Sequence, residues 1–284
     1  MIDPVAEQVL AYLNYLRAMN GVPQVHYANT GYAKFRADYM LKVNQLRAYH
    51  EGGIPGYYFF NRRGHYFYME ENSTLFIFPF PTTKYNGIYS SDETSPTGIV
   101  MVAQTLLNNL VYDDSEYGWL HRDSLLNPCF NYADVHAGEN DKAYVLVVAM
   151  INARVSWLVK PNYDGKVVRF EGRVHSGFEP SHVIITKLVP DPRKVEGWYA
   201  ASYGDRVARV APEPDTHQGI DTIRPTEWVM DSSYVKVAFP FTPKEKGLYT
   251  IFLVGRDKRG IRWVPYSKAV NPEYCPLMMY TILV

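Results

Sequence analysis

The pattern of apolar residues changes near Arg154, and this change constrains the fold more than any other feature of the 284-residue sequence. Before it, apolar side chains recur at the spacing of helices, interrupted by short strand-like runs. After it, the runs are short, rich in β-branched and aromatic residues, and bounded by Gly, Pro and Asp, as in antiparallel β-structure. We therefore predict an α+β protein with two domains, residues 1–153 and residues 154–284, the second being a β-sandwich.

Helical spacing and capping residues predict four helices in the first half, over residues 4–20, 30–49, 95–110 and 119–126. Residues 132–136 and 143–151 are expected to form a β-hairpin. Residues 52–89 have little periodicity apart from an apolar run over residues 75–80. We interpret this segment as a long ordered loop with one short strand, and loops of such length are often functional.

The second half contains four clear strand candidates, over residues 167–174, 182–188, 234–241 and 248–254. Gly247-Leu248-Tyr249 opens the strongest of them, and a tyrosine at this place is reminiscent of the tyrosine corner of immunoglobulin-like sandwiches. The Cys–Trp–Cys spacing of true immunoglobulin domains is absent. The sequence therefore indicates an immunoglobulin-like architecture only.

The charge balance limits the kinds of partner. Lys and Arg number 29 and Asp and Glu number 29, so the formal net charge is zero. This balance gives no electrostatic reason to expect nucleic acid or an anionic membrane as partner. No transmembrane segment is expected either, because no stretch is long and apolar enough. The first residues lack the pattern of a secretory leader, so the protein is either cytoplasmic or has lost a leader.

The chain has 2 cysteines, Cys129 and Cys275. Two are too few for a disulfide scaffold or a zinc cluster. If they pair with each other, the bridge closes a loop of nearly half the chain and stabilises the fold by roughly 4–5 kcal/mol. The alternative is two buried thiols that act as small apolar side chains.

Four features in sequence order carry a resemblance to a known family. Residues 10–29 contain Tyr15-Leu16-Arg17 in the first helix and then Gly21-Val22-Pro23-Gln24-Val25-His26-Tyr27, and an Ala-rich second helix comes next. Glu70-Glu71-Asn72 is similar to a Gly-Glu-Asn motif. The segment 119–128 is similar to G-H-R-x-x-L-L-N-P, with Leu120 in place of the Gly. Residues 5–151 thereby resemble the CAP superfamily, also called SCP-like or cysteine-rich secretory protein type domains, which implies an α-β-α sandwich.

The resemblance also implies a cleft with two histidines and one or two acidic residues. His121 matches the second histidine, Glu71 matches the glutamate, and His50 stands where the first histidine is found. Glu51 or Glu70 can supply the second acidic residue. His50 and His121 could together ligate a divalent metal, zinc above all, with Glu71 as base or orienting group. Each also has a structural interpretation: His121 bound to backbone, His50 beside a helix C-terminus, and Glu71 as an exposed carboxylate.

Three functions follow as alternatives. The first is a secreted or cell-surface CAP-domain protein that binds a small apolar ligand, a glycan or a protein partner, with the β-sandwich as an adhesion or spacing element. The second is a metal-dependent hydrolase that uses the same cleft. The third is a structural extracellular protein without a working site. The extracellular location is implied by the usual location of the family. A metal is expected only if the imidazoles of His50 and His121 lie close together.

Overall fold

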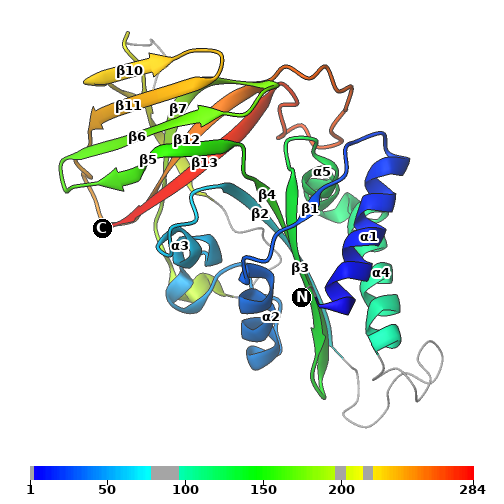
Figure 1. Cartoon of the computed structure of the whole chain (residues 1–284). Coiled ribbons are helices and arrows are strands. Elements are labelled where there is room, and N and C mark those ends of the chain that lie inside the picture. The colour runs from blue at the N-terminus through cyan, green and yellow to red at the C-terminus, as the bar shows by residue number, and fades with distance from the viewer. Residues whose placement is uncertain (1–2, 78–95, 196–202, 214–219) are drawn as a thin grey trace.

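The computed structural model describes residues 3–77, 96–195, 203–213 and 220–284. Figure 1 shows helices around a sheet in the first half of the chain and a stack of strands in the second half. The α+β class expected from the sequence is confirmed, whereas the division into domains at residues 153 and 154 stays a prediction. Within these ranges, every helix is too short or too polar to cross a membrane.

The first half has three layers: a sheet with the strand order β1-β3-β4-β2 lies between two layers of helices (Figure 1). The strands are β1 (His26–Tyr27), β2 (Tyr68–Ile77), β3 (Tyr132–Glu139) and β4 (Ala143–Asn152). One face is covered by α1 (Pro4–Met19), α4 (Pro96–Tyr112) and α5 (Leu120–Leu126). The other face is covered by α2 (Tyr32–Val43), and α3 (Gly56–Asn61) packs beside α2 and against a strand of the second half. Short 3-10 turns lie at Glu51–Gly53 and Ser115–Tyr117.

The helices begin and end for local reasons. The side chain of Asp3 accepts a hydrogen bond of 2.9 Å from the amide of Val5, and Pro4 is the first residue of α1, as expected. α2 ends at Val43 and not at Tyr49, because Asn44 adopts a left-handed φ of 49°. α4, α5 and the β3–β4 hairpin lie close to their expected positions.

Residues 52–89 were expected to form a long loop with one short strand, and the structure differs from this expectation in two elements. α3 lies within it, and β2 is a strand of 10 residues that pairs with β4 along its whole length. β4 is buried at every position, so it offers β2 a continuous row of backbone partners. The polar run Glu70-Glu71-Asn72 hides this strand in the sequence. Residues 78–89, including the end of the expected strand over residues 75–80, lie outside the described part of the chain.

The second half consists of two sheets. The first has the order β10-β11-β6-β5, and the second has the order β13-β12-β7-β8-β9. Their strands are β5 (Val155–Tyr163), β6 (Val167–Val174), β7 (Phe178–Leu188), β8 (Asp205–Val210), β9 (Asp221–Ile223), β10 (Glu227–Met230), β11 (Tyr234–Pro240), β12 (Leu248–Asp257) and β13 (Tyr274–Leu283). A 3-10 turn lies at Pro192–Val195. The four strand candidates of the sequence fall within β6, β7, β11 and β12, with β11 ending one residue early.

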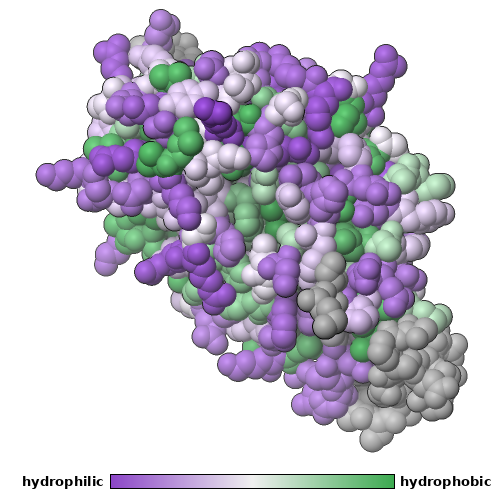
Figure 2. Space-filling view, viewed as in Figure 1, coloured by the Kyte–Doolittle hydropathy of each residue, from purple (hydrophilic) through white to green (hydrophobic). Residues whose placement is uncertain are grey.

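The five-stranded sheet is buried on both faces. On one face, Ile251 and Leu253 of β12 pack with Phe170 of β6 in the core between the two sheets. On the other face, Phe252 and Val254 of β12 belong to the same apolar core as the helices of the first half. The two halves therefore share a core. The visible face of the molecule carries mostly hydrophilic side chains, with smaller apolar areas between them (Figure 2).

A covalent bond also joins the halves. Cys129, which follows α5, and Cys275 of β13 form a disulfide with 5.6 Å between their Cα atoms. The structure thus has the first of the two alternatives that the sequence leaves open. Nearby, Arg259 donates a hydrogen bond of 2.6 Å to the carbonyl oxygen of Pro128. The start of the β3 strand is therefore tied to the sandwich by both a covalent and a polar link.

Candidate functional site

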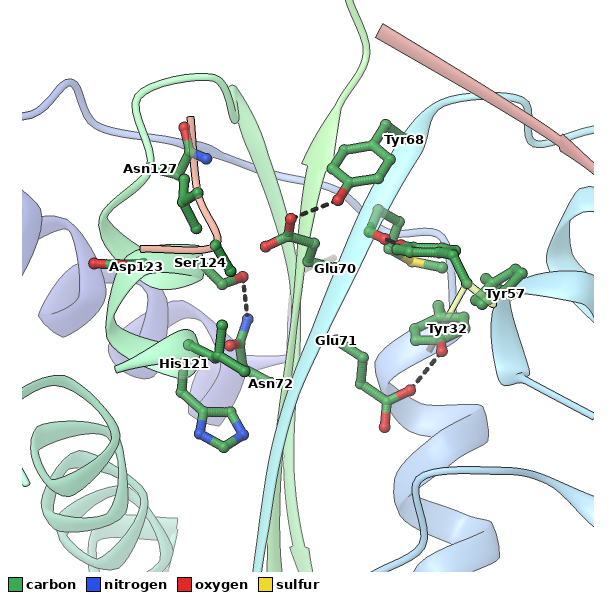
Figure 3. Close-up of a pocket in the computed structure, with 15 residues that line it drawn as sticks. Tyr32, Tyr57, Tyr68, Glu70, Glu71, Asn72, His121, Asp123, Ser124 and Asn127 are labelled. Carbon is green, nitrogen blue, oxygen red and sulfur yellow. Dashed lines mark hydrogen bonds between the residues drawn. The ribbon is translucent and has the colours of Figure 1, made fainter. Parts of the chain in front are cut away.

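A cavity of about 400 Å³ lies at the outer edge of β2, where no described strand pairs with it. Its walls come from α2, α3, β2 and α5 and from two segments of the second half (Figure 3). The polar and aromatic lining consists of Tyr32, Tyr57, Tyr68, Tyr203, Glu70, Glu71, Asp123, His121, Asn72, Ser124 and Asn127. This size is typical of cavities that hold small organic ligands.

β2 supplies acidic side chains to both sides of the sheet, because successive side chains of a strand point to opposite faces. Glu70 and Asn72 point toward α5, where the Asn72 amide donates to Ser124 Oγ at 2.9 Å. Glu71 points the other way, toward Tyr32 of α2 (Figure 3). Since β2 is an edge strand, both sets of side chains reach the same cavity around its edge.

Among the described residues, the partners of Glu70 are hydroxyl groups and not cations. The hydroxyl of Tyr68 donates to its carboxyl at 2.5 Å, and Ser124 is a second hydroxyl partner. Burial raises the pKa of Glu70 above its usual value, although these two hydrogen bonds oppose the rise. The nearby carboxylate of Asp123 adds to the rise. Glu70 is therefore the acidic group of the cavity whose ionised form is least compensated.

Glu71, in contrast, is fully engaged. Arg36 of α2 is completely buried, and its Nε lies 2.7 Å from Glu71 Oε2. The hydroxyl of Tyr32 donates to the same oxygen at 2.5 Å. Gly56 allows this packing, because a Cβ at that position would lie 2.6 Å from Cδ of Arg36. Glu71, which was identified through the family motif, thus forms a buried ion pair with Arg36.

His121 is held by a carboxylate that the sequence did not identify. Its Nδ1 lies 2.7 Å from Oδ1 of Asp114, which is almost fully buried. The other oxygen of Asp114 accepts hydrogen bonds from the backbone amides of His121 and Arg122 at 2.8 and 3.0 Å. With Nδ1 donating to Asp114, Nε2 is left as the acceptor of the neutral ring. His121 can therefore accept a proton or a hydrogen bond at the cavity wall.

The second half of the chain completes the cavity. The hydroxyl of Tyr203 donates a hydrogen bond to the carbonyl oxygen of Met69. Tyr203 thereby covers part of the edge of β2 with which no described strand pairs. The segment between β12 and β13 contributes Ala269 and Val270. It is fixed to α5 by Asp123, which accepts hydrogen bonds from the backbone amides of residues 266 and 267 at 2.9 and 2.6 Å. The cavity is incomplete without these segments.

His50 lies apart from the cavity. Its ring stacks between Phe35 and Tyr39, with centroid distances of 4.6 and 4.1 Å. Burial lowers the pKa of His50, and the charge of Arg36 lowers it further. His50 is not among the residues that line the cavity with His121 and Glu71, so the structure brings together only two of the three residues predicted from the family motif.

The donor set does not fit a zinc ion. Within the described ranges, no group of three or more His, Cys, Asp or Glu side chains is arranged to hold a metal. Glu71 is occupied by Arg36, and His50 lies in an aromatic stack away from His121. A catalytic zinc site needs three protein ligands with open geometry.

Several site residues escaped the sequence analysis. Tyr203, Ala269 and Val270 lie in the second half, and no local pattern connects them with β2. Asp114 stands seven residues before His121, a spacing that carries no motif. Arg36 had a usable signal, because an arginine on the apolar side of a helix must be paired when buried. Neither a protein-family model nor a curated protein matches the chain.

Proposed function

We propose that this protein is an extracellular or cell-surface binding module, in which a CAP-like domain and an immunoglobulin-like sandwich together form a small-ligand site. The observation that carries the proposal is the cavity at the edge of β2. It is lined by residues from both halves, and it combines aromatic walls with a few polar groups. This combination is characteristic of ligand sites in proteins.

The contacts of Arg17 support the CAP-like part of the proposal. Arg17 is completely buried, and its guanidinium donates to the carbonyl oxygens of Pro23, Leu125 and Asn127 at 2.7, 2.5 and 3.1 Å. These four residues belong to the sequence segments that resemble the family. One side chain thus joins the segments in space, which gives a physical reason for their occurrence together.

Two further observations support the sandwich and the location. The hydroxyl of Tyr249 donates to the carbonyl oxygen of Glu245 at 3.0 Å, which is the hydrogen bond of a tyrosine corner. The disulfide between Cys129 and Cys275 favours an oxidising compartment, because cytosolic thiols are normally kept reduced. The tyrosine hydrogen bond thus agrees with an immunoglobulin-like sandwich, and the disulfide agrees with a secreted or surface protein.

A binding role is better supported than hydrolysis. The cavity holds a His121–Asp114 pair, but the hydroxyl group of Ser124, which also lines the cavity, accepts from Asn72 and contacts Glu70. No described contact joins Ser124 to the imidazole of His121, as a nucleophile–base pair requires. The metal-dependent alternative lacks converging ligands, as described above.

The test is a fragment screen by ligand-observed NMR on the whole chain. Val270→Trp should fill the cavity from a surface segment and abolish binding of the hits, while the fold is kept. Val264→Trp is the matched control, because it lies in the same segment, is 77% exposed and does not line the cavity. Hits that bind both variants equally, or a screen without hits, would contradict the proposed function.

A further inference from the structure

The charged side chains that line the cavity are all acidic among the described residues. Three carboxyl groups, from Glu70, Glu71 and Asp123, face it, and no described Lys or Arg lines it. Glu71 is neutralised from behind by Arg36, and Asp123 is compensated by two backbone amides. The carboxyl of Glu70 is the one that lacks such compensation. An anionic ligand would meet repulsion at these walls, and a cation would be attracted.

The aromatic wall next to Glu70 has the chemistry to hold a cation. The Tyr203 ring packs against Tyr57 and Tyr68, with centroid distances of 4.9 and 5.9 Å, and all three line the cavity. The negative faces of aromatic rings attract organic ammonium groups, and this attraction increases when the site excludes water. Tyr68 also donates its hydroxyl to Glu70, so the aromatic wall and the carboxyl are in direct contact.

We propose that the ligand of this cavity is a small organic cation, whose ammonium group is placed against the carboxyl of Glu70 and the rings of Tyr57, Tyr68 and Tyr203. This inference rests on the proposed ligand-binding function and specifies its ligand class. A bound ammonium group supplies the counter-charge that Glu70 lacks in the protein alone. Glu70 stands where the family motif has a glycine, so the feature belongs to this chain.

Proton release follows from the same arrangement. In the described part of the chain, the groups that face Glu70 are the hydroxyls of Tyr68 and Ser124, the ring of Tyr203 and the carboxylate of Asp123, and none of them is a cation. A cation binds the ionised carboxylate best, so binding should release a proton from Glu70 at a pH below its raised pKa. The affinity should accordingly fall as the pH is lowered through that pKa.

The experiment is calorimetric titration of the whole chain with choline and with 3,3-dimethylbutan-1-ol, its uncharged isostere. We expect choline to bind about thirtyfold more tightly than the alcohol, because the carboxylate of Glu70 and the aromatic rings together attract its ammonium group. Glu70→Gln keeps the acceptor for Tyr68 and should reduce this ratio to about threefold or less. Glu116→Gln removes the same charge from an exposed position and should leave the ratio unchanged.

The outcomes separate the two proposals. If fragments bind the cavity but choline shows no advantage over the alcohol, the cation inference is wrong and the binding function stands. The inference is also wrong if Glu70→Gln and Glu116→Gln have equal effects, or if only inorganic cations such as zinc or magnesium bind. A cavity that no fragment enters overturns both. Val270→Trp reports on the site itself, because it should block choline and the alcohol alike.

Discussion

Arg36 and Glu71 form a buried ion pair, with 2.7 Å between Nε and Oε2, where α2 packs against β2. The Arg36 side chain is fully buried and Glu71 is 11% exposed, so neither charge can be solvated if the other is lost. The pair fixes one wall of the cavity through Tyr32, whose hydroxyl donates to Glu71. Its role is thus to position groups of the site, and its removal should be costly.

Arg36→Met should destabilise the protein by about 3–5 kcal/mol, because it leaves the Glu71 carboxylate buried beside an apolar side chain. Urea unfolding measures this change. Lys34→Met is the matched control on the same helix, since Lys34 and Asp38 form an ion pair with both side chains more than half exposed. We expect less than about 1 kcal/mol for the control. Equal losses in the two variants would show that the Arg36 charge is not buried.

Breaking the disulfide should weaken the whole fold. Cys129 and Cys275 are 146 residues apart, and a bridge that closes such a loop restricts the unfolded chain by about 5 kcal/mol in the chain-entropy model. The double variant Cys129→Ala/Cys275→Ala should therefore unfold at a lower urea concentration than the oxidised wild type. Reduced wild type should match the double variant. An unchanged midpoint after reduction would mean that the bridge is absent in solution.

The pH dependence of stability should contain a contribution from Glu70. Burial raises its pKa in the folded protein, so between the unfolded and folded pKa values the native state binds more protons than the unfolded state. The stability that Glu70 contributes is fully present below its pKa in the unfolded chain and is lost as the pH rises through its pKa in the folded protein. Glu70→Gln should remove this loss and be more stable than wild type at neutral pH. A variant that is less stable at pH 7 and keeps the wild-type slope would contradict the burial of this carboxyl.

His182 in β7 should produce the opposite slope. Burial and the charges of Arg206, Arg209 and Arg256 lower its pKa to about 4. Between pH 6.5 and 4 the unfolded chain therefore holds a proton that the native state does not, and stability falls as the pH falls. His182→Gln should reduce this loss, measured by thermal unfolding across the same interval. The exposed His175→Gln serves as control, and an identical pH profile for both variants would refute the assignment.

The sequence predicted the elements whose pattern is local. The spacing of Val9 and Leu13 defined α1, and the run over residues 248–254 defined β12. This run is apolar without alternation, which is the pattern of a strand buried on both faces, and β12 has that position. Only the end of β2 was expected, in the apolar run over residues 75–80. The rest was missed because its central residues are polar, and its strand conformation depends on β4, which is more than 60 residues away.

The site was predictable only in part, for a related reason. His121 and Glu71 were found through motifs and do line the cavity, but the motifs say nothing of their partners, Asp114 and Arg36. His50 was placed at the site by its position after α2. Its side chain instead stacks on aromatic residues, because the helix ends early and the following segment turns the ring toward Phe35. Such placements depend on tertiary packing.

The central claim is that ligand binds at the edge of β2, in the cavity that both halves form. A crystal structure of the protein soaked with a screening hit tests this most directly. We predict that the ligand lies between Glu70, Tyr203 and His121, with Val270 closing the cavity. Ligand density beside His50, or on the outer surface of the sandwich with the β2 cavity empty, would contradict the account.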